Sequence, residues 1–129
     1  MEMGATIRIG VDMVEIDRLA RLVAASPAFA RRTFSLRELA AASRMQDRRR
    51  REYLAGRFAV KEAALKALGV GLLGDLSLNE IETTNSATEA PRLALGGRAL
   101  KLARREGIRE LHVSISHEFR FAVAFVVLS

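Results

Sequence analysis

The sequence contains no cysteine and only two histidines. The absence of cysteine excludes disulfide bonds and zinc sites built from thiolates. With two histidines, a histidine-rich transition-metal site is not expected either. Any bound metal should therefore be a hard cation, held by carboxylate and phosphate oxygens.

Long apolar runs are also missing. No stretch approaches the ~20 consecutive apolar residues that a membrane-spanning helix needs. Residues 1–4 lack the basic region and apolar stretch of a signal peptide. The chain has 129 residues, half of them hydrophobic, which is enough for one core. We therefore expect a single cytoplasmic domain over residues 1–129 that makes no membrane contact.

Aromatic residues make up only 5% of the chain, whereas the net charge is +6. This excess of positive charge favours an anionic partner. The basic clusters comprise Arg44, Arg48, Arg49, Arg50 and Arg51, and then Arg98, Lys101, Arg104 and Arg105. No aromatic residues are interleaved with them as single-strand nucleic-acid binding requires, so we expect no nucleic-acid partner. An acidic protein or a phosphorylated small molecule fits the charge, and a solvated basic face without a specific partner is the alternative.

Near the N-terminus, apolar and other residues alternate from Thr6 to Asp12, which predicts a β-strand. The residues expected to point inward are Ile7, Ile9 and Val11, and the other face carries Arg8, Gly10 and Asp12. Asp12 is placed at or near the end of this strand. Because Gly10 has no side chain, it leaves room for a ligand on the face of Asp12.

Further periodic patterns predict a series of short elements. They are helices over 14–25, 28–32 and 97–106, and strands over 77–83, 92–95, 111–117 and 121–128. Ser35 and Glu38 have the spacing of a capping box, which predicts a helix start. The last strand is apolar on both faces, so we expect a central or interface strand. The predicted fold class is α+β, with a small antiparallel sheet packed against one long and several short helices.

The one long helix is predicted over residues 52–68, ending at Gly69. Both sides of this helix are apolar, which predicts that the helix is buried on both sides. Charged residues on a buried helix are unusual and indicate pairing or a functional role. Those in its second half are Arg57, Lys61, Glu62 and Lys66. One carboxylate with three cations could hold a metal ion and a polyphosphate. The alternative is an ordinary surface pair between Glu62 and Lys66. The glycine-rich segment 69–74 lacks the Gly-Lys-Ser/Thr of a Walker loop and predicts only a flexible wall near the helix end.

Two acidic residues far apart in the sequence, Asp12 and Glu62, are the candidate metal ligands. If the fold brings them together, they supply two hard oxygen ligands, which suits Mg²⁺ with waters and substrate phosphates completing its shell. A hydrolase triad of Ser114 or Ser116 with His117 and Asp12 is disfavoured. No nucleophile elbow is present, and the adjacent Ser116 and His117 point to opposite faces of a strand.

Three sequence blocks, 9–16, 53–63 and 112–117, resemble the holo-[acyl-carrier-protein] synthases, the small bacterial 4′-phosphopantetheinyl transferases. The blocks come in the order and spacing of that family, segment 34–39 is similar as well, and the resemblance spans essentially the whole chain. It implies the 4′-phosphopantetheinyl transferase fold. It also implies that coenzyme A donates its 4′-phosphopantetheine group to a serine of an acyl carrier protein, releasing adenosine 3′,5′-bisphosphate.

The resemblance also implies roles for individual residues. Asp12 and Glu62 match the magnesium ligands, and Lys66 matches a phosphate-contacting lysine. These three form the implied catalytic set. The implied contacts to coenzyme A are Arg57, Lys61, Lys66, Gly69 and His117, with Arg57 and His117 facing the nucleotide. The serine proton goes either to a metal-bound water or to Glu62, and both possibilities stay open.

The carrier protein is expected to dock on the first helix, through Arg18 and with Arg32 as a second contact. Relatives often carry further basic residues where this chain has 23–28, so Arg21 or Arg31 could substitute. Relatives also commonly carry Gly-Lys-Pro where this chain has 89–91, so one phosphate contact is missing here. The resemblance further implies a homotrimer with active sites shared between subunits.

A competing interpretation is a non-catalytic basic module that binds nucleic acid or an acidic protein. Magnesium-dependent release of adenosine 3′,5′-bisphosphate from coenzyme A would support the transferase. Steeply salt-dependent affinity for duplex nucleic acid would support the module.

Overall fold

A computed structural model of the chain describes residues 6–71, 76–85, 88 and 90–129. The elements in chain order are β1 (Arg8–Glu15), α1 (Ile16–Ala25), α2 (Pro27–Thr33), α3 (Leu36–Ser43), α4 (Asp47–Leu68), the 3-10 turn η1 (Leu78–Glu80), β2 (Ile81–Asn85), β3 (Pro91–Leu95), α5 (Gly97–Arg105), β4 (Leu111–His117) and β5 (Phe121–Leu128). The α+β class predicted from the sequence is confirmed. None of the described helices combines the length and apolarity that crossing a bilayer requires.

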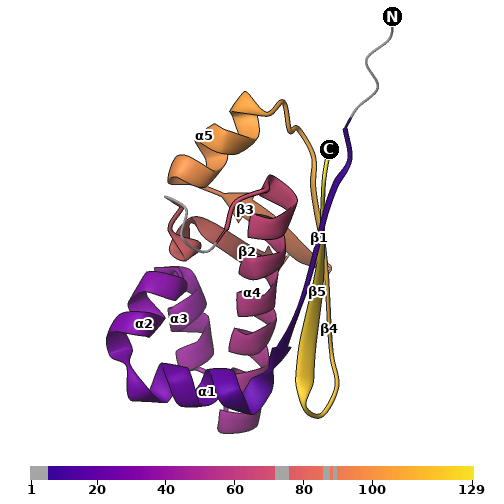
Figure 1. Cartoon of the computed structure of the whole chain (residues 1–129). Coiled ribbons are helices and arrows are strands. Elements are labelled where there is room, and N and C mark those ends of the chain that lie inside the picture. The colour runs from indigo at the N-terminus through magenta and orange to yellow at the C-terminus, as the bar shows by residue number, and fades with distance from the viewer. Residues whose placement is uncertain (1–5, 72–75, 86–87, 89) are drawn as a thin grey trace, which may run out of the picture.

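The long helix α4 lies in the middle of the molecule (Figure 1). An antiparallel sheet in the order β1-β5-β4 covers one of its sides. Helices α1, α2 and α3 gather around its N-terminal half on the other side, and α5 lies near its C-terminal end. The hairpin of β2 and β3 forms a second, two-stranded sheet beside α4. Both core clusters draw residues from α4 and β5; the first extends toward β2, β3 and α5, and the second toward α1–α3.

The C-terminal hairpin was predicted with the bounds that the structure has. β4 and β5 pair antiparallel, and β5 is the central strand with β1 on its other edge. The inner face of β5 consists of small and medium residues that are fully buried against α4, namely Ala122, Ala124, Val126 and Leu128. Its outer face carries Val123, Phe125 and Val127, with Phe125 51% exposed.

The facing of β1 differs from the prediction. Ile7, Ile9 and Val11 were expected inward, but they lie on the open face of the sheet, where Ile9 is 64% exposed. Gly10 and Asp12 face α4 instead, because the backbone of β1 lies directly on the helix. A Cβ atom at Gly10 would lie 1.8 Å from the carbonyl oxygen of Ala63. β1 also continues to Glu15, so Asp12 lies within the strand and not at its end.

Helix α4 begins at Asp47, five residues before the predicted start, and incorporates the arginine cluster 48–51. Ion pairs one turn apart support this first part of the helix, between Arg51 and Asp47 and between Arg48 and Glu52. The helix ends as predicted, with Gly69 in the left-handed conformation at φ 77°. Most of the last four turns is buried, as the apolar character of both sides indicated.

Among the shorter elements, the capping box at Ser35 and Glu38 is confirmed, with both reciprocal hydrogen bonds present. The strand predicted over 77–83 is instead the turn η1 followed by β2. β2 extends two residues beyond the predicted strand, through Thr84 and Asn85. Part of the glycine-rich segment 69–74 and of the segment 89–91 lies outside the described residues.

Candidate functional site

Helix α4 presents functional side chains on two opposite sides. Arg57 and Glu62 are five residues apart, which separates their directions by roughly 140° around a helix. Glu62 faces β1 and α1, where it lines a groove with Asp12. Arg57 faces β2 and β4, where it lines a second groove with Asn85 and His117. We call them the acidic groove and the arginine groove.

The acidic groove has a volume of about 330 Å³ and lies between β1, α1 and α4. Asp12 and Glu62 both line it, so the structure brings the two predicted metal ligands together. Phe58, one turn before Glu62 on α4, forms part of its apolar wall, and Arg18 of α1 adds a cation. The groove thus combines three carboxylates, those of Asp12, Glu15 and Glu62, with one guanidinium group and an apolar wall.

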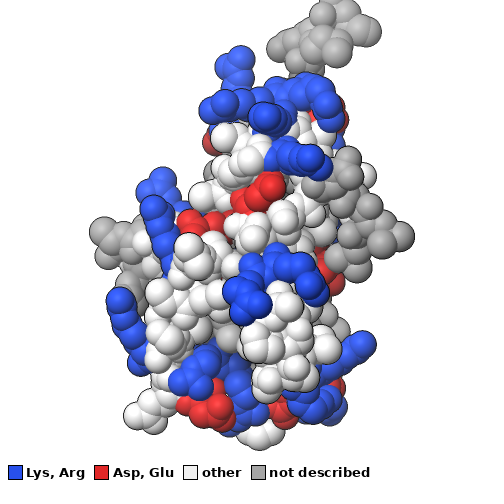
Figure 2. All heavy atoms as spheres, turned by 90° about the vertical axis from the view of Figure 1, so that its left-hand side faces the viewer, with Lys and Arg blue, Asp and Glu red and all other residues white. Residues whose placement is uncertain are grey.

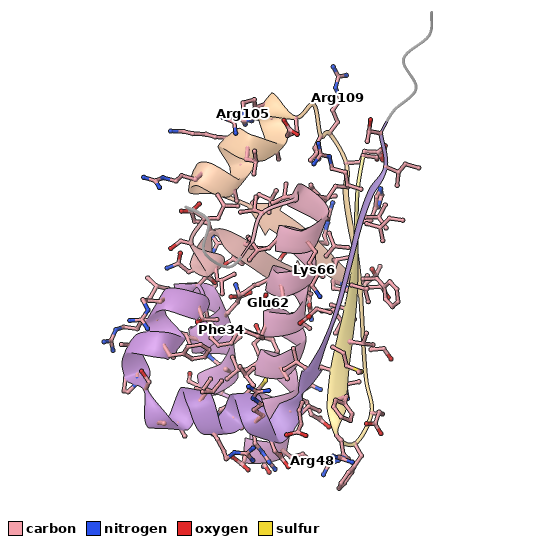
Figure 3. The ribbon with its side chains drawn as sticks, viewed as in Figure 1. Phe34, Arg48, Glu62, Lys66, Arg105 and Arg109 are labelled. Carbon is pink, nitrogen blue, oxygen red and sulfur yellow. The ribbon has the colours of Figure 1, made fainter. Side chains whose placement is uncertain are left out.

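Lys66 adds a second cation next to this groove. Its Nζ donates to Asp12 Oδ1 at 3.1 Å and to the backbone oxygen of Val11 at 3.0 Å. The alternative of a Glu62–Lys66 surface pair is therefore wrong, because the ammonium group reaches across to β1. Figure 3 shows Glu62 and Lys66 on successive turns of α4. Lys66 is largely exposed, so its charge is available to an anion in the groove.

In the acidic groove, the surroundings of Glu62 disfavour the ionised form of its carboxyl group. Burial raises the pKa of its carboxyl above the ordinary value, the nearby Asp12 carboxylate raises it further, and Lys66 opposes both. A divalent cation bound between the two carboxylates would remove this repulsion. Two carboxylates are enough for Mg²⁺, which usually keeps waters and takes substrate phosphates. Within the described residues there is no group of three or more metal-ligating side chains, so the donor set fits a cation that shares its shell with a substrate.

The arginine groove, with a volume of about 190 Å³, is built around Arg57. The Arg57 guanidinium lies 4.1 Å from the centre of the Tyr53 ring and donates to Asn85 Oδ1 at 2.8 Å. His117, at the end of β4, lines the same groove, and its Nδ1 lies 3.7 Å from Glu52 Oε2. The structure therefore brings Arg57 and His117 together, but on the side of α4 opposite to the acidic groove.

A further hollow of about 280 Å³ adjoins Arg57 between α3, α4 and β2. Thr83 and Asn85 of β2 line it together with Tyr53. Two buried polar atoms at this hollow, Arg57 Nε and Thr83 Oγ1, have no hydrogen-bond partner in the described part of the chain. Buried polar atoms are normally paired, so these two are exceptions in the packing around Arg57.

Lys61, predicted to contact coenzyme A, lines neither groove. Its side chain is fully buried, and its Nζ lies 2.8 Å from Glu38 Oε1. The same ammonium also donates to the backbone oxygens of Leu78, at 3.0 Å, and Ile81. All three donors of Lys61 are thus used inside the protein, because its neighbours on this side of α4 are α3 and β2 and not a groove.

The remaining predicted residues lie apart from each other. Arg18 is exposed and lines the acidic groove. Arg32 is exposed in the last turn of α2. Gly69 is exposed just beyond the end of α4, three residues after Lys66. None of these positions conflicts with the predicted roles, and none of them tests those roles.

The sequence interpretation assigned no site role to several residues that line the grooves, namely Tyr53, Phe58, Thr83 and Asn85. Tyr53 could have been found, because it stands one helical turn before Arg57, a spacing at which side chains meet. Thr83 and Asn85 carried no such signal. They reach Arg57 only through the packing of β2 beside α4.

Comparison with known proteins agrees with this geometry. The family model described as the 4′-phosphopantetheinyl transferase superfamily matches residues 8–124. The holo-[acyl-carrier-protein] synthase of an Enterobacter strain is 42% identical over 125 residues, covering 96% of this chain and 98% of the relative.

Solved structures are similar over the same length. The holo-[acyl-carrier-protein] synthase of Neisseria meningitidis has a TM-score of 0.84 at 34% identity, with 95% of this chain and 97% of that chain covered. The Bacillus anthracis enzyme, solved in complex with coenzyme A (3′,5′-ADP), has a TM-score of 0.79 at 34% identity, with 96% and 97% covered. A family match over most of the chain and close relatives over its full length lead to one conclusion: the chain belongs to the 4′-phosphopantetheinyl transferase superfamily.

Proposed function

We propose that this protein is a holo-[acyl-carrier-protein] synthase. It transfers 4′-phosphopantetheine from coenzyme A to a serine hydroxyl of an apo acyl carrier protein in the cytoplasm. The observation that carries the proposal is the pairing of Asp12 and Glu62 in one groove beside Lys66, in a chain of this family. In the reaction, a bond forms between the serine oxygen and the phosphorus that bears the pantetheine group. The bond from that phosphorus to the bridging oxygen breaks, and adenosine 3′,5′-bisphosphate leaves.

We further propose that Asp12 and Glu62 hold a magnesium ion, which fits their oxygen donors and their mutual repulsion. When bound, the ion neutralises charge on the pyrophosphate. Lys66 keeps the Asp12 carboxylate in place and offers an exposed ammonium group to a phosphate. Arg18 stands at the same groove, where it can meet an acidic carrier protein docked on α1.

The arginine groove is proposed to take the nucleotide end of coenzyme A. Arg57 and His117 offer positive or hydrogen-bonding groups to a phosphate. Because this groove and the acidic groove lie on opposite sides of α4, one molecule of coenzyme A is expected to bridge grooves of two different chains.

The open face of the sheet supports such an assembly. Ile9 and Met13, each 64% exposed, and Phe125, 51% exposed, lie side by side on strands β1 and β5. None of the described helices covers this face (Figure 1). An apolar face of this kind on a soluble-type domain favours burial against other protein. We propose that three copies of the chain pack these faces together as a homotrimer.

The test of the proposed activity is magnesium-dependent release of adenosine 3′,5′-bisphosphate from coenzyme A in the presence of apo acyl carrier protein. Replacing Glu62 by Gln removes one ligand charge and should lower the rate by at least about two orders of magnitude. The matched control is Glu110→Gln, which changes an exposed carboxylate at the start of β4 and should leave the rate unchanged. Activity of Glu62→Gln within a few-fold of wild type would contradict the assignment of Glu62.

The competing function, a basic module, rests on the positive surface of this protein. Figure 2 shows Lys and Arg side chains spread over the face that includes α5. Arg98, Lys101, Arg104 and Arg105 of that helix are exposed. If the chain releases no adenosine 3′,5′-bisphosphate but binds duplex nucleic acid with steep salt dependence, the basic module is the better description.

A further inference from the structure

The buried ion pair between Lys61 and Glu38 lies outside both grooves, although Glu38 also lines the hollow beside Arg57. Lys61 is 0% and Glu38 1% exposed. Besides its bond to Lys61, Glu38 accepts the backbone N–H groups of Ser35 at 3.0 Å and Thr83 at 3.1 Å. Every donor of the ammonium group and both oxygens of the carboxylate have partners.

The partners of this pair on β2 follow a pattern. Lys61 donates to the carbonyl of Ile81, and Glu38 accepts from the N–H of Thr83. In an antiparallel strand, the backbone groups of alternate residues point to the same edge. β2 pairs with β3 on one edge only, so its other edge has no strand beside it. The buried side chains of Lys61 and Glu38 therefore take the place of a neighbouring strand and satisfy that edge.

The last residue of β2, Asn85, lines the arginine groove. Asn85 lies two residues beyond Thr83 on β2 and accepts from Arg57. Arg57 lies one helical turn before Lys61 on α4. Residues 81, 83 and 85 of β2 thus make successive polar contacts with α4 and α3. A shift of β2 along α4 would break all of these contacts together, whereas the apolar contacts between the two elements could readjust.

Stability alone does not explain such a pair. Burying two charges costs desolvation energy that their attraction only partly repays, and apolar residues of similar size are often as stable. The best-attested use of a buried polar group is to select one register among several packings. We propose that Lys61 and Glu38 are positioning residues that set the register of β2 on α4, and thereby place Thr83, Asn85 and Arg57 for binding the nucleotide. This inference rests on the proposed function, since it names what holds the nucleotide groove in shape.

The experiment compares wild type with the double variant Lys61→Met/Glu38→Gln, which removes both charges while keeping the buried volume. Two properties are measured: thermal unfolding, and the affinity for adenosine 3′,5′-bisphosphate by titration calorimetry. We expect a folded protein with a lowered unfolding temperature, because the carbonyls of Leu78 and Ile81 lose their donor. Its Kd should be raised about tenfold or more, because the ligand-contacting groups are no longer held in register. In the transferase assay, KM for coenzyme A should rise by a similar factor while kcat changes only a few-fold.

A matched control separates positioning from general destabilisation. Val60→Ala truncates a fully buried side chain of α4 next to Lys61. It should lower the unfolding temperature but leave the nucleotide affinity unchanged. If the double variant does not fold, the single variant Glu38→Gln replaces it, since Lys61 keeps its bonds to Leu78 and Ile81 there; its Kd should also rise.

The outcomes separate two failures. A folded double variant that binds the nucleotide as tightly as wild type overturns the positioning role, and so does a Val60→Ala protein whose affinity falls by the same factor. A wild-type protein that does not bind adenosine 3′,5′-bisphosphate at all overturns the proposed nucleotide groove instead.

Discussion

At Glu62, burial and a neighbouring carboxylate act in the same direction. Both raise the pKa of this carboxyl above its ordinary value of 4.5, and Lys66 only partly offsets them. A carboxyl with a raised pKa in the folded state destabilises the fold when it is ionised, and a bound cation reverses that effect. Glu62, which we propose as a metal ligand, is thus a source of instability in the metal-free protein.

This gives a prediction on pH and stability. In metal-free buffer at pH 7–8, Glu62→Gln should unfold at a higher temperature than wild type. The folded chain binds the Glu62 proton more tightly than the unfolded chain, so the destabilisation by ionisation is complete above the raised pKa and vanishes below about 4.5. Thermal unfolding monitored from pH 8 to pH 4 should show the difference shrinking in that direction.

When magnesium is added at neutral pH, wild type should unfold at a higher temperature than Glu62→Gln, because wild type gains a ligand that the variant binds poorly. Glu110→Gln serves as the control and should follow wild type at every pH. A metal-free Glu62→Gln protein that is less stable than wild type at pH 7–8 would contradict the electrostatic account of the acidic groove.

Among the elements, β1 and α4 make the closest contact in the molecule. Their approach depends on Gly10, since a Cβ atom there would collide with the Ala63 carbonyl oxygen. The same contact puts Asp12, two residues later on the same face of β1, next to α4. The absence of a side chain at Gly10 therefore allows both the packing of β1 on α4 and the placement of Asp12 next to that helix.

Replacing Gly10 by Ala should destabilise the protein by about 3 kcal/mol, because the added methyl group meets helix backbone that cannot move aside alone. The midpoint of urea unfolding measures this loss. Gly71→Ala is the matched control, since a Cβ at Gly71 meets nothing within 4 Å. Equal midpoints for both variants would show that β1 can move away from α4.

Several elements were predictable because their signals are local. The capping box at Ser35, the glycine end of α4 and the alternation in the last hairpin depend on residues close in sequence, and the structure has them as predicted. The facing of β1 was not predictable in this way. Alternation shows that Ile9 and Gly10 lie on opposite faces, but not which face meets the helix, since an apolar face can also be reserved for another chain.

For the whole molecule, the main feature is the separation of the two grooves by α4, together with the uncovered sheet face. Each chain holds an acidic groove on one side and an arginine groove on the other. If a complete site uses one groove from each of two neighbours, variants defective in different grooves should complement each other in mixed trimers.

To test this, Glu62→Gln and Arg57→Ala chains with different tags are produced together, and trimers that carry both tags are isolated. Each variant alone should be nearly inactive. In each mixed trimer, one of the three shared sites combines an intact Glu62 with an intact Arg57, so about a third of wild-type activity should return. Mixed trimers no more active than the separate variants would show that one chain forms the whole site, and a monomeric wild type in light scattering would contradict the assembly itself.

Fold class and superfamily were readable from the chain directly. The periodic patterns indicated the α+β class and the three family-like blocks indicated the superfamily, because each signal depends on residues near one another in the sequence. The meeting of Asp12 with Glu62 and the burial of Lys61 needed the three-dimensional fold. Both depend on which side of α4 each neighbouring element occupies, and no local pattern encodes that: Lys61 and Glu62 are adjacent in sequence, yet one is sealed against β2 and the other opens into the acidic groove.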